Sequence, residues 1–210
     1  MTTRSYLIVG HGGQGVLDLG NFLCYDAILN GQRTAYTPSY GPETRGGKVR
    51  CYVVASDEEI DSPIVDHPDV LVAMNNPSMD FEGIVKHDGL LVMNTSLIDR
   101  KPSRQDLQIV RVPATDIADR MSNQVSELSD SRVLQNAVAY GSLLATLGVQ
   151  FDESSVQLML QHVYAGNKTR FIPANLLAVK NGYQFITDSQ NIQQDAGETR
   201  SPTATSPRNG

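Results

Sequence analysis

The fold is decided by the stretch Ser5-Tyr-Leu-Ile-Val-Gly-His-Gly-Gly-Gln-Gly15 and by the helical pattern that follows it. Residues 5–9 form a short apolar, β-branched run that stops at glycines, which is typical of a buried parallel strand. Apolar residues then recur at helical spacing from Val16 to Ala27, and Asn30-Gly31 ends the pattern. A strand, a glycine-rich turn and a helix in this order predict the start of an α/β fold.

The rest of the chain continues the alternation of strands and helices. Apolar runs predict further strands over 33–36, 48–56, 69–74, 89–94 and 107–112, and a short helix with proline near its start over 77–86. The first of these strands is expected to end at Thr37-Pro38. Strands separated in this way imply a mostly parallel, Rossmann-like sheet with helices on both faces.

The C-terminal third is expected to be helical. Residues 138–147 are apolar on nearly every side and include small residues, so this helix should be buried or lie at a subunit contact. A capping box at Ser154 and Gln157 predicts the start of a second helix. Residues 187–210 contain almost no large apolar side chain. We therefore expect one domain over residues 1–186 and a disordered tail over residues 187–210.

Composition limits the class of protein. The 210 residues carry a formal net charge of −6, which argues against binding to the phosphate backbone of nucleic acids. The two cysteines, Cys24 and Cys51, lack the spacing of a disulfide framework, a zinc site or an iron–sulfur cluster. No apolar stretch approaches the roughly 18–20 residues of a membrane span. We expect a cytoplasmic protein that contacts neither nucleic acid nor membrane and holds no metal of its own.

The segment Gly10-His-Gly-Gly-Gln-Gly15 has the G-x-G-x-x-G spacing of a dinucleotide-binding loop. Because it follows a strand and opens a helix, its N–H groups and the positive end of the helix are placed to receive an anion. A dinucleotide domain also carries an Asp or Glu about 20 residues later, where this chain has Tyr36-Thr-Pro38. Two interpretations stay open: an anion-binding loop, or glycines that only allow close packing. His11 is expected to be a spacer.

The segment Tyr40-Gly-Pro-Glu-Thr-Arg-Gly-Gly47 combines one acid and one base with four residues that constrain the backbone. Such a loop suits a side chain that must be held in place. Arg45 is able to hold a carboxylate or phosphate with two hydrogen bonds, oriented by Glu43. The alternative is a structural Glu43–Arg45 pair that braces a long turn.

Together the two glycine motifs resemble the gamma subunit of the 2-oxoacid:ferredoxin (acceptor) oxidoreductases. The resemblance covers about residues 5–185. It continues through Ser56-Asp-Glu-Glu-Ile-Asp-Ser-Pro-Ile-Val65, Met74-Asn-Asn-Pro-Ser78, Asn94-Thr-Ser-Leu-Ile98, Val112-Pro-Ala-Thr-Asp-Ile-Ala118 and Ile172-Pro-Ala-Asn-Leu-Leu-Ala178. The Asn-x-Pro-Ser and Ser-Pro-Ile-Val forms look nearer the 2-oxoglutarate or branched-chain (2-ketoisovalerate) members than the pyruvate members.

The resemblance implies a multi-subunit enzyme that oxidatively decarboxylates a 2-oxoacid to an acyl-CoA and CO2. Thiamine diphosphate, Mg²⁺ and 4Fe-4S clusters would sit in partner subunits, and CoA would be the co-substrate. The partners implied are alpha, beta and ferredoxin-like delta subunits, with ferredoxin or an NAD-linked flavin subunit as acceptor. This chain would not be active alone.

The resemblance also implies a role for the two loops on the CoA or substrate side of the active site. The residues expected there are Gly12, Gly13, Gln14, Gly15, Tyr40, Glu43, Arg45, Gly46 and Gly47. No catalytic and no metal-binding residue is expected in this chain. Two other functions remain open, a purely structural docking subunit of the same complex and a freestanding dinucleotide-binding dehydrogenase.

Overall fold

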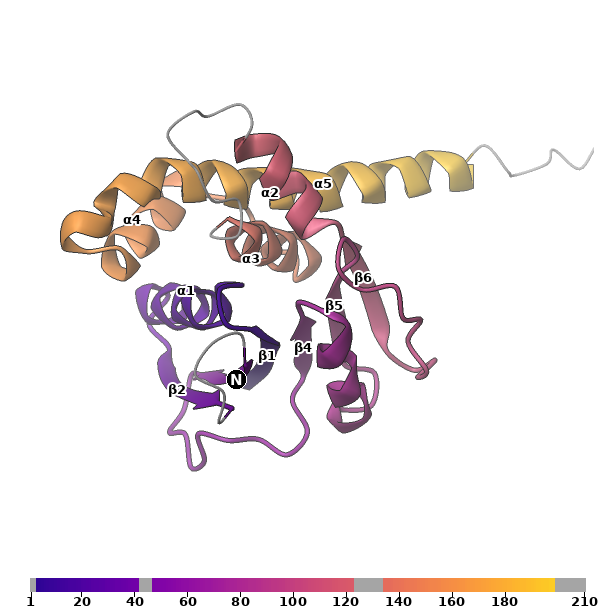
Figure 1. Ribbon diagram of the computed structural model, residues 1–210, viewed down its shortest axis with the longest axis horizontal. Coiled ribbons are helices and arrows are strands. Elements are labelled where there is room, and N and C mark those ends of the chain that lie inside the picture. Colours follow the sequence, from indigo (N-terminus) through magenta and orange to yellow (C-terminus); the bar gives the residue numbers. More distant parts are fainter. Residues whose placement is uncertain (1–2, 42–46, 123–133, 199–210) are drawn as a thin grey trace, which may run out of the picture.

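The computed structural model describes residues 3–41, 47–122 and 134–198, and it contains a six-stranded sheet (Figure 1). The strand order is β2-β3-β1-β4-β5-β6. The strands are β1 (Thr3–His11), β2 (Arg33–Tyr40), β3 (Lys48–Ser56), β4 (Val70–Ala73), β5 (Leu90–Asn94) and β6 (Gln108–Val112). Strands β1, β4, β5 and β6 pair in parallel, which confirms the expected mostly parallel α/β sheet.

Strand β3 is the exception, because it runs antiparallel to both β1 and β2. The connection from Tyr40 to Lys48 is too short for a crossover, so β2 and β3 form a hairpin instead. Strand β2 also continues past Thr37-Pro38, where we expected it to end. It lies at the edge of the sheet, where a proline is tolerated because its missing N–H faces away from the ladder.

The helices cover the two faces of the sheet unequally. Helices α1 (Val16–Leu29), α2 (Ala114–Ser122), α3 (Gln135–Thr146), α4 (Glu153–Val163) and α5 (Ile172–Glu198) gather on one side in Figure 1. They enclose the larger core, which includes Ile8, Phe22 and Tyr140. On the opposite face the 3₁₀ helix η1 (Asn76–Ile84) packs over a smaller core around Leu7 and Leu91. A second 3₁₀ helix, η3 (Gly166–Phe171), precedes α5.

Helix α3 is buried along its length, as its composition predicts, and α5 of the same chain covers it. The two helices cross at a pair of glycines. A Cβ atom at Gly141 would lie 1.9 Å from the carbonyl oxygen of Val179, and one at Gly182 would lie 2.0 Å from that of Val138. Only residues without a side chain allow the two backbones to approach this closely.

Two expectations for the C-terminal third differ from the structure. Asp152, rather than Ser154, caps α4, and its side chain accepts a hydrogen bond from the Ser155 N–H at 2.9 Å. The expected boundary after residue 186 lies inside α5, which continues to Glu198. Once the first turns of a helix have formed and packed against the protein, further turns can be added without an apolar face. Residues 199–210 lie outside the described residues.

Candidate functional site

The glycine loop joins β1 to α1 at the carboxyl edge of the parallel strands. Gly13 and Gly15 have φ angles of 94° and 71°, a region that favours glycine. A Cβ atom at Gly15 would also lie 2.6 Å from the side chain of Asn136. No side chain caps α1, so the N–H groups of its first turn are left for water or a ligand. The loop therefore combines close packing with an open helix N-terminus.

Gln14, expected to contact CoA or substrate, turns its side chain into the fold. Its Oε1 accepts hydrogen bonds from the His11 N–H and from Asn75 Nδ2, both at 2.7 Å, and its Nε2 donates to the Met74 carbonyl at 3.3 Å. These bonds join the carboxyl ends of β1 and β4. The chain turns to opposite sides of the sheet from these two strand ends: from β1 it passes through α1 to β2, and from β4 it passes to β5. Doubly wound sheets bind ligands at such a position. The Gln14 side chain braces β1 against β4 at this position.

Two motifs that carried the resemblance have structural roles at the same edge. In Met74-Asn-Asn-Pro-Ser78, the side chain of Asn75 caps η1 by accepting from the Ser78 N–H at 3.2 Å. Asn94, at the end of β5, donates to Thr115 Oγ1 at 2.9 Å, and Thr115 donates to Gln135 Oε1 at 2.9 Å. These contacts hold the ends of β4 and β5 to the elements that follow them.

The second predicted loop meets the first. The Gly12 N–H donates to the Gly47 carbonyl at 3.1 Å, so the backbones of the two glycine motifs are directly bonded. Tyr40 lies at the end of β2 with 65% of its surface exposed. Glu43, Arg45 and Gly46 lie outside the described residues. The structure thus brings Gly12, in the loop that opens α1, into contact with Gly47, which the sequence could only place in a separate loop.

A basic cluster beside this junction escaped the sequence reasoning. Lys48 Nζ lies 5.4 Å and Arg50 Cζ 5.5 Å from the ring centre of Phe81 in η1. Nearby, Arg100 Nη1 donates to Asp80 Oδ1 at 2.6 Å and holds the pKa of Asp80 below its usual value. The available signal was the polar start of the strand over 48–56, although the sequence alone did not show that η1 would pack on it.

The dinucleotide alternative is disfavoured by the strand order. In a dinucleotide-binding domain the second strand lies beside the first, so its terminal acid reaches the ribose. Here β3 separates β2 from β1, which moves the end of β2 away by a further strand spacing of about 4.8 Å. Tyr36 on β2 instead packs against Gly20, and its hydroxyl donates to the Leu17 carbonyl at 3.4 Å.

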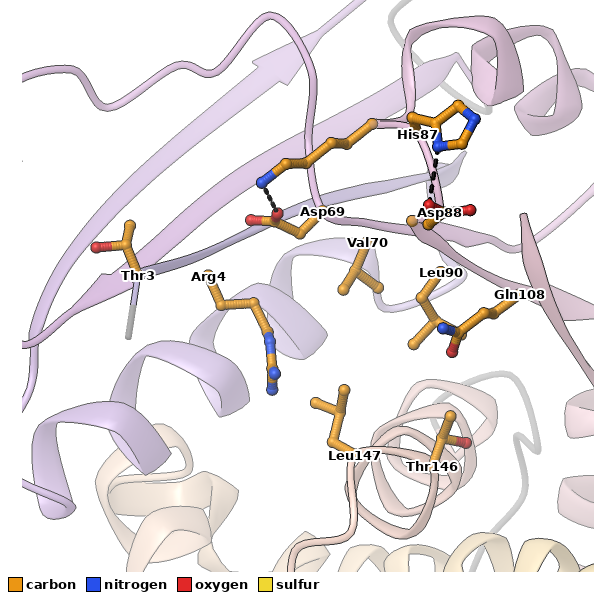
Figure 2. A pocket seen from close by; sticks show the side chains of 12 residues that line it. Thr3, Arg4, Asp69, Val70, His87, Asp88, Leu90, Gln108, Thr146 and Leu147 are labelled. Atoms are coloured by element: carbon orange, nitrogen blue, oxygen red, sulfur yellow. Dashed lines mark hydrogen bonds and ion pairs between the residues drawn. The ribbon is translucent and has the colours of Figure 1, made fainter. Parts of the chain in front are cut away.

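A separate cavity of about 390 Å³ lies at the amino edge of the sheet (Figure 2). Its wall includes the Lys86–Asp69 ion pair at 3.0 Å and a contact of 2.9 Å between His87 Nδ1 and Asp88 Oδ2. Although partial burial acts to raise the pKa of Asp69, hydrogen bonds from Ser5 and Lys86 lower it below its usual value. Because it lies beside the first residues of β4 and β5, this cavity is distinct from the glycine loop.

Two other kinds of feature are absent from the described ranges. Those residues contain no group of three or more His, Cys, Asp or Glu side chains placed to hold a metal ion. Among the same residues, no helix is both long enough and apolar enough to cross a membrane.

Comparison with known proteins identifies the family. A family model described as pyruvate ferredoxin/flavodoxin oxidoreductase matches residues 5–185. The chain belongs to this family. The resemblance carried by the glycine motifs is therefore confirmed, over the range that the motifs predicted.

Relatives within the pyruvate ferredoxin/flavodoxin oxidoreductase family are named as subunits of oxidoreductases. The ketoisovalerate oxidoreductase subunit VorA of Methanothermobacter marburgensis is 37% identical over 177 residues, covering 83% of this chain and 35% of VorA. The 2-oxoglutarate synthase subunit KorC of Methanocaldococcus jannaschii is 34% identical over 183 residues, covering 85% of this chain and 91% of KorC. The chain thus spans about a third of the length of VorA and most of KorC.

Solved structures confirm the fold of this family member. The gamma subunit of a keto/oxoacid ferredoxin oxidoreductase from Geobacter sulfurreducens superposes with a TM-score of 0.68 at 24% identity, over 88% of this chain and 99% of that one. A 2-oxoglutarate:ferredoxin oxidoreductase from Magnetococcus marinus, with 2-oxoglutarate, coenzyme A and succinyl-CoA bound, gives 0.73 at 20% identity, over 90% of this chain and 32% of that one.

Proposed function

We propose that this chain is the noncatalytic gamma subunit of a multi-subunit, thiamine diphosphate-dependent 2-oxoacid oxidoreductase. The observation that carries the proposal is the match to KorC over most of both chains, because KorC is named as one subunit of a 2-oxoglutarate synthase. In the proposed reaction a 2-oxoacid and CoA yield an acyl-CoA, CO2, a proton and two electrons. The electrons pass to ferredoxin or another acceptor. The family relatives favour 2-oxoglutarate or 2-ketoisovalerate as substrate.

The chemistry of decarboxylation is assigned to the partner subunits. Thiamine diphosphate, with its Mg²⁺, would supply the chemistry of decarboxylation when bound to the partner subunits. The proposal therefore places thiamine diphosphate, Mg²⁺ and the 4Fe-4S clusters on the alpha, beta and delta subunits. No step of bond making or breaking is assigned to a side chain of this chain.

This chain would contribute the CoA or substrate side of the active site. The supporting geometry is the bond between Gly12 and Gly47, which joins an uncapped helix N-terminus to the loop that contains Arg45. Backbone N–H groups at a helix start and an arginine are two standard ways in which proteins hold phosphate groups. In this role the glycine loop and the Tyr40–Gly47 loop orient CoA without reacting with it.

A purely structural docking role is the second candidate. The observation that favours it is the use of Gln14 side-chain atoms inside the fold, where they brace β1 against β4 rather than point to a ligand. Under that alternative the two loops would contact only protein.

The two candidates are separated by an Arg45→Ala variant of the assembled enzyme. The matched control is Arg33→Ala, which removes an exposed arginine paired with Glu59 at the opposite edge of the sheet. If the loop orients CoA, Arg45→Ala raises the KM for CoA and leaves the KM for the 2-oxoacid near that of the control. Unchanged assembly together with an unchanged KM for CoA would reject the CoA role.

A further inference from the structure

Two cations of β3 are held side by side at the carboxyl edge of the sheet. Lys48 and Arg50 are separated by one residue, so their side chains leave the strand on the same face. Both reach the ring of Phe81, at 5.4 Å and 5.5 Å from its centre. The negative face of an aromatic ring attracts each cation and limits its freedom. The ring thus holds two like charges about 6.7 Å apart along the strand.

The cluster contains more positive than negative charge. Lys48 Nζ is 4.0 Å from Asp80 Oδ2, but Arg100 already binds the other oxygen of this carboxylate at 2.6 Å. Arg50 has only the Ser39 hydroxyl, at 3.5 Å, and within the described residues no carboxylate forms an ion pair with it. Lys48 and Arg100 therefore share one carboxylate and Arg50 has none, in a chain whose overall formal charge is −6. Holding like charges together without a partner is unfavourable, and an anion bound there would relieve it.

The position of the cluster relates it to the glycine loop. In the β1–β3 ladder, Lys48 lies opposite His11 and Arg50 lies opposite Val9. The residue before Lys48, Gly47, accepts the hydrogen bond from Gly12. Lys48 therefore stands one residue from the point where the two loops meet, and its side chain lies on the face of the sheet that η1 covers.

We propose that Lys48 and Arg50 form a phosphate-binding surface for the phosphate groups of CoA. The inference rests on the proposed function, which brings CoA to this edge, and it adds two residues that determine affinity for the phosphorylated part of that molecule. The compact charge of lysine and the planar fork of arginine both suit phosphate oxygens. Two cations spaced along one strand fit a ligand with more than one phosphate group, so the surface selects CoA over unphosphorylated thiols such as pantetheine.

The test uses the assembled enzyme with Lys48→Gln, Arg50→Gln and the double variant. Lys180→Gln and Arg33→Gln are the controls, because each removes an exposed, ion-paired cation elsewhere. We expect each single variant to raise the KM for CoA about threefold and the double variant about tenfold, with kcat unchanged. Pantetheine, used as an alternative thiol acceptor, should show no change in KM. The KM for CoA should also rise with salt in the parent enzyme and less so in the double variant.

A binding measurement provides a readout that is independent of turnover. Calorimetric titration of the complex with adenosine 3′,5′-bisphosphate, which carries phosphates but no thiol, should show about tenfold weaker binding in the double variant. Equal losses for CoA and pantetheine would indicate a structural defect and overturn the inference. Loss of subunit assembly in the double variant, with folding intact by circular dichroism, would indicate that the cations contact a carboxylate of a partner subunit, which also overturns it.

The same data separate failure of this inference from failure of the proposed function. If Arg45→Ala weakens CoA binding but the Lys48/Arg50 variants do not, only the phosphate surface is wrong. If neither set of variants alters CoA binding, the CoA role of the whole edge is wrong.

Discussion

Replacing Gly182 by alanine would place a methyl group 2.0 Å from the carbonyl oxygen of Val138, at the crossing of α3 and α5. An ordinary contact begins near 3.4 Å, so the two helices would have to separate locally by about 1.4 Å. The obstructing atoms are backbone and cannot move aside as a side chain would. Overpacking of this kind costs about 3 kcal/mol, and the better helix propensity of alanine returns about 1 kcal/mol. The net expected loss is about 2 kcal/mol of unfolding free energy.

Such a loss corresponds to a fall in melting temperature of about 4–8 °C for a chain of this size. Urea and thermal unfolding, followed by circular dichroism, would measure it. Gly83→Ala is the matched control, because no atom lies within 4 Å of a Cβ atom at that glycine and its φ is not positive. Equal stability of the Gly182→Ala and Gly83→Ala variants would refute the close crossing of α3 and α5.

Three further outcomes are expected. Gly15→Ala should cost at least about 2 kcal/mol in urea unfolding, because it combines a φ of 71° with a contact of 2.6 Å to Asn136; stability equal to that of the parent would contradict the loop geometry. The lowered pKa of Asp69 means that its ion pair and hydrogen bonds stabilise the fold above the unfolded-state pKa of about 3.9 and are lost as pH falls through the lower folded-state value. Asp69→Asn should therefore flatten the dependence of melting temperature on pH below about pH 5, and an unaltered acid limb would show that Asp69 contributes nothing. Burial raises the pKa of Cys24 to about 11 and that of Cys51 to about 12, so both thiols should resist alkylation at pH 8 until the chain unfolds, whereas rapid labelling of the native protein would disprove their burial.

Much of the fold could be predicted because hydrophobic pattern and turn residues act locally. The buried strand over 5–9, the helix that ends at Asn30-Gly31 and the apolar helix over 138–147 all followed from spacing alone. The antiparallel direction of β3 could not be predicted from the sequence. The composition of a strand does not determine which strands it pairs with, or in which direction. The length of α5 was missed because residues 187–198 include almost no large apolar side chain, the signal on which we relied.

The candidate site was harder to predict than the fold. The sequence singled out both glycine loops, but only the folded chain shows that Gly12 and Gly47 are bonded. The sequence also could not show that the Gln14 side chain forms hydrogen bonds inside the fold, because a glutamine in a glycine loop can point toward the protein or toward a ligand. Lys48 and Arg50 were overlooked because a polar strand end is usually solvated. Their contacts with the Phe81 ring arise only when η1 packs on the face of the sheet opposite α1.

In the function that we propose, this chain does not catalyse alone and completes the CoA side of a 2-oxoacid oxidoreductase. The most direct test is CoA-dependent reduction of an artificial electron acceptor by the purified partner subunits, with and without this chain, on 2-oxoglutarate and 2-ketoisovalerate. We predict no activity from the chain by itself and a large fall in the KM for CoA when it joins its partners. Partner subunits that show the same activity and the same KM for CoA without this chain would contradict it.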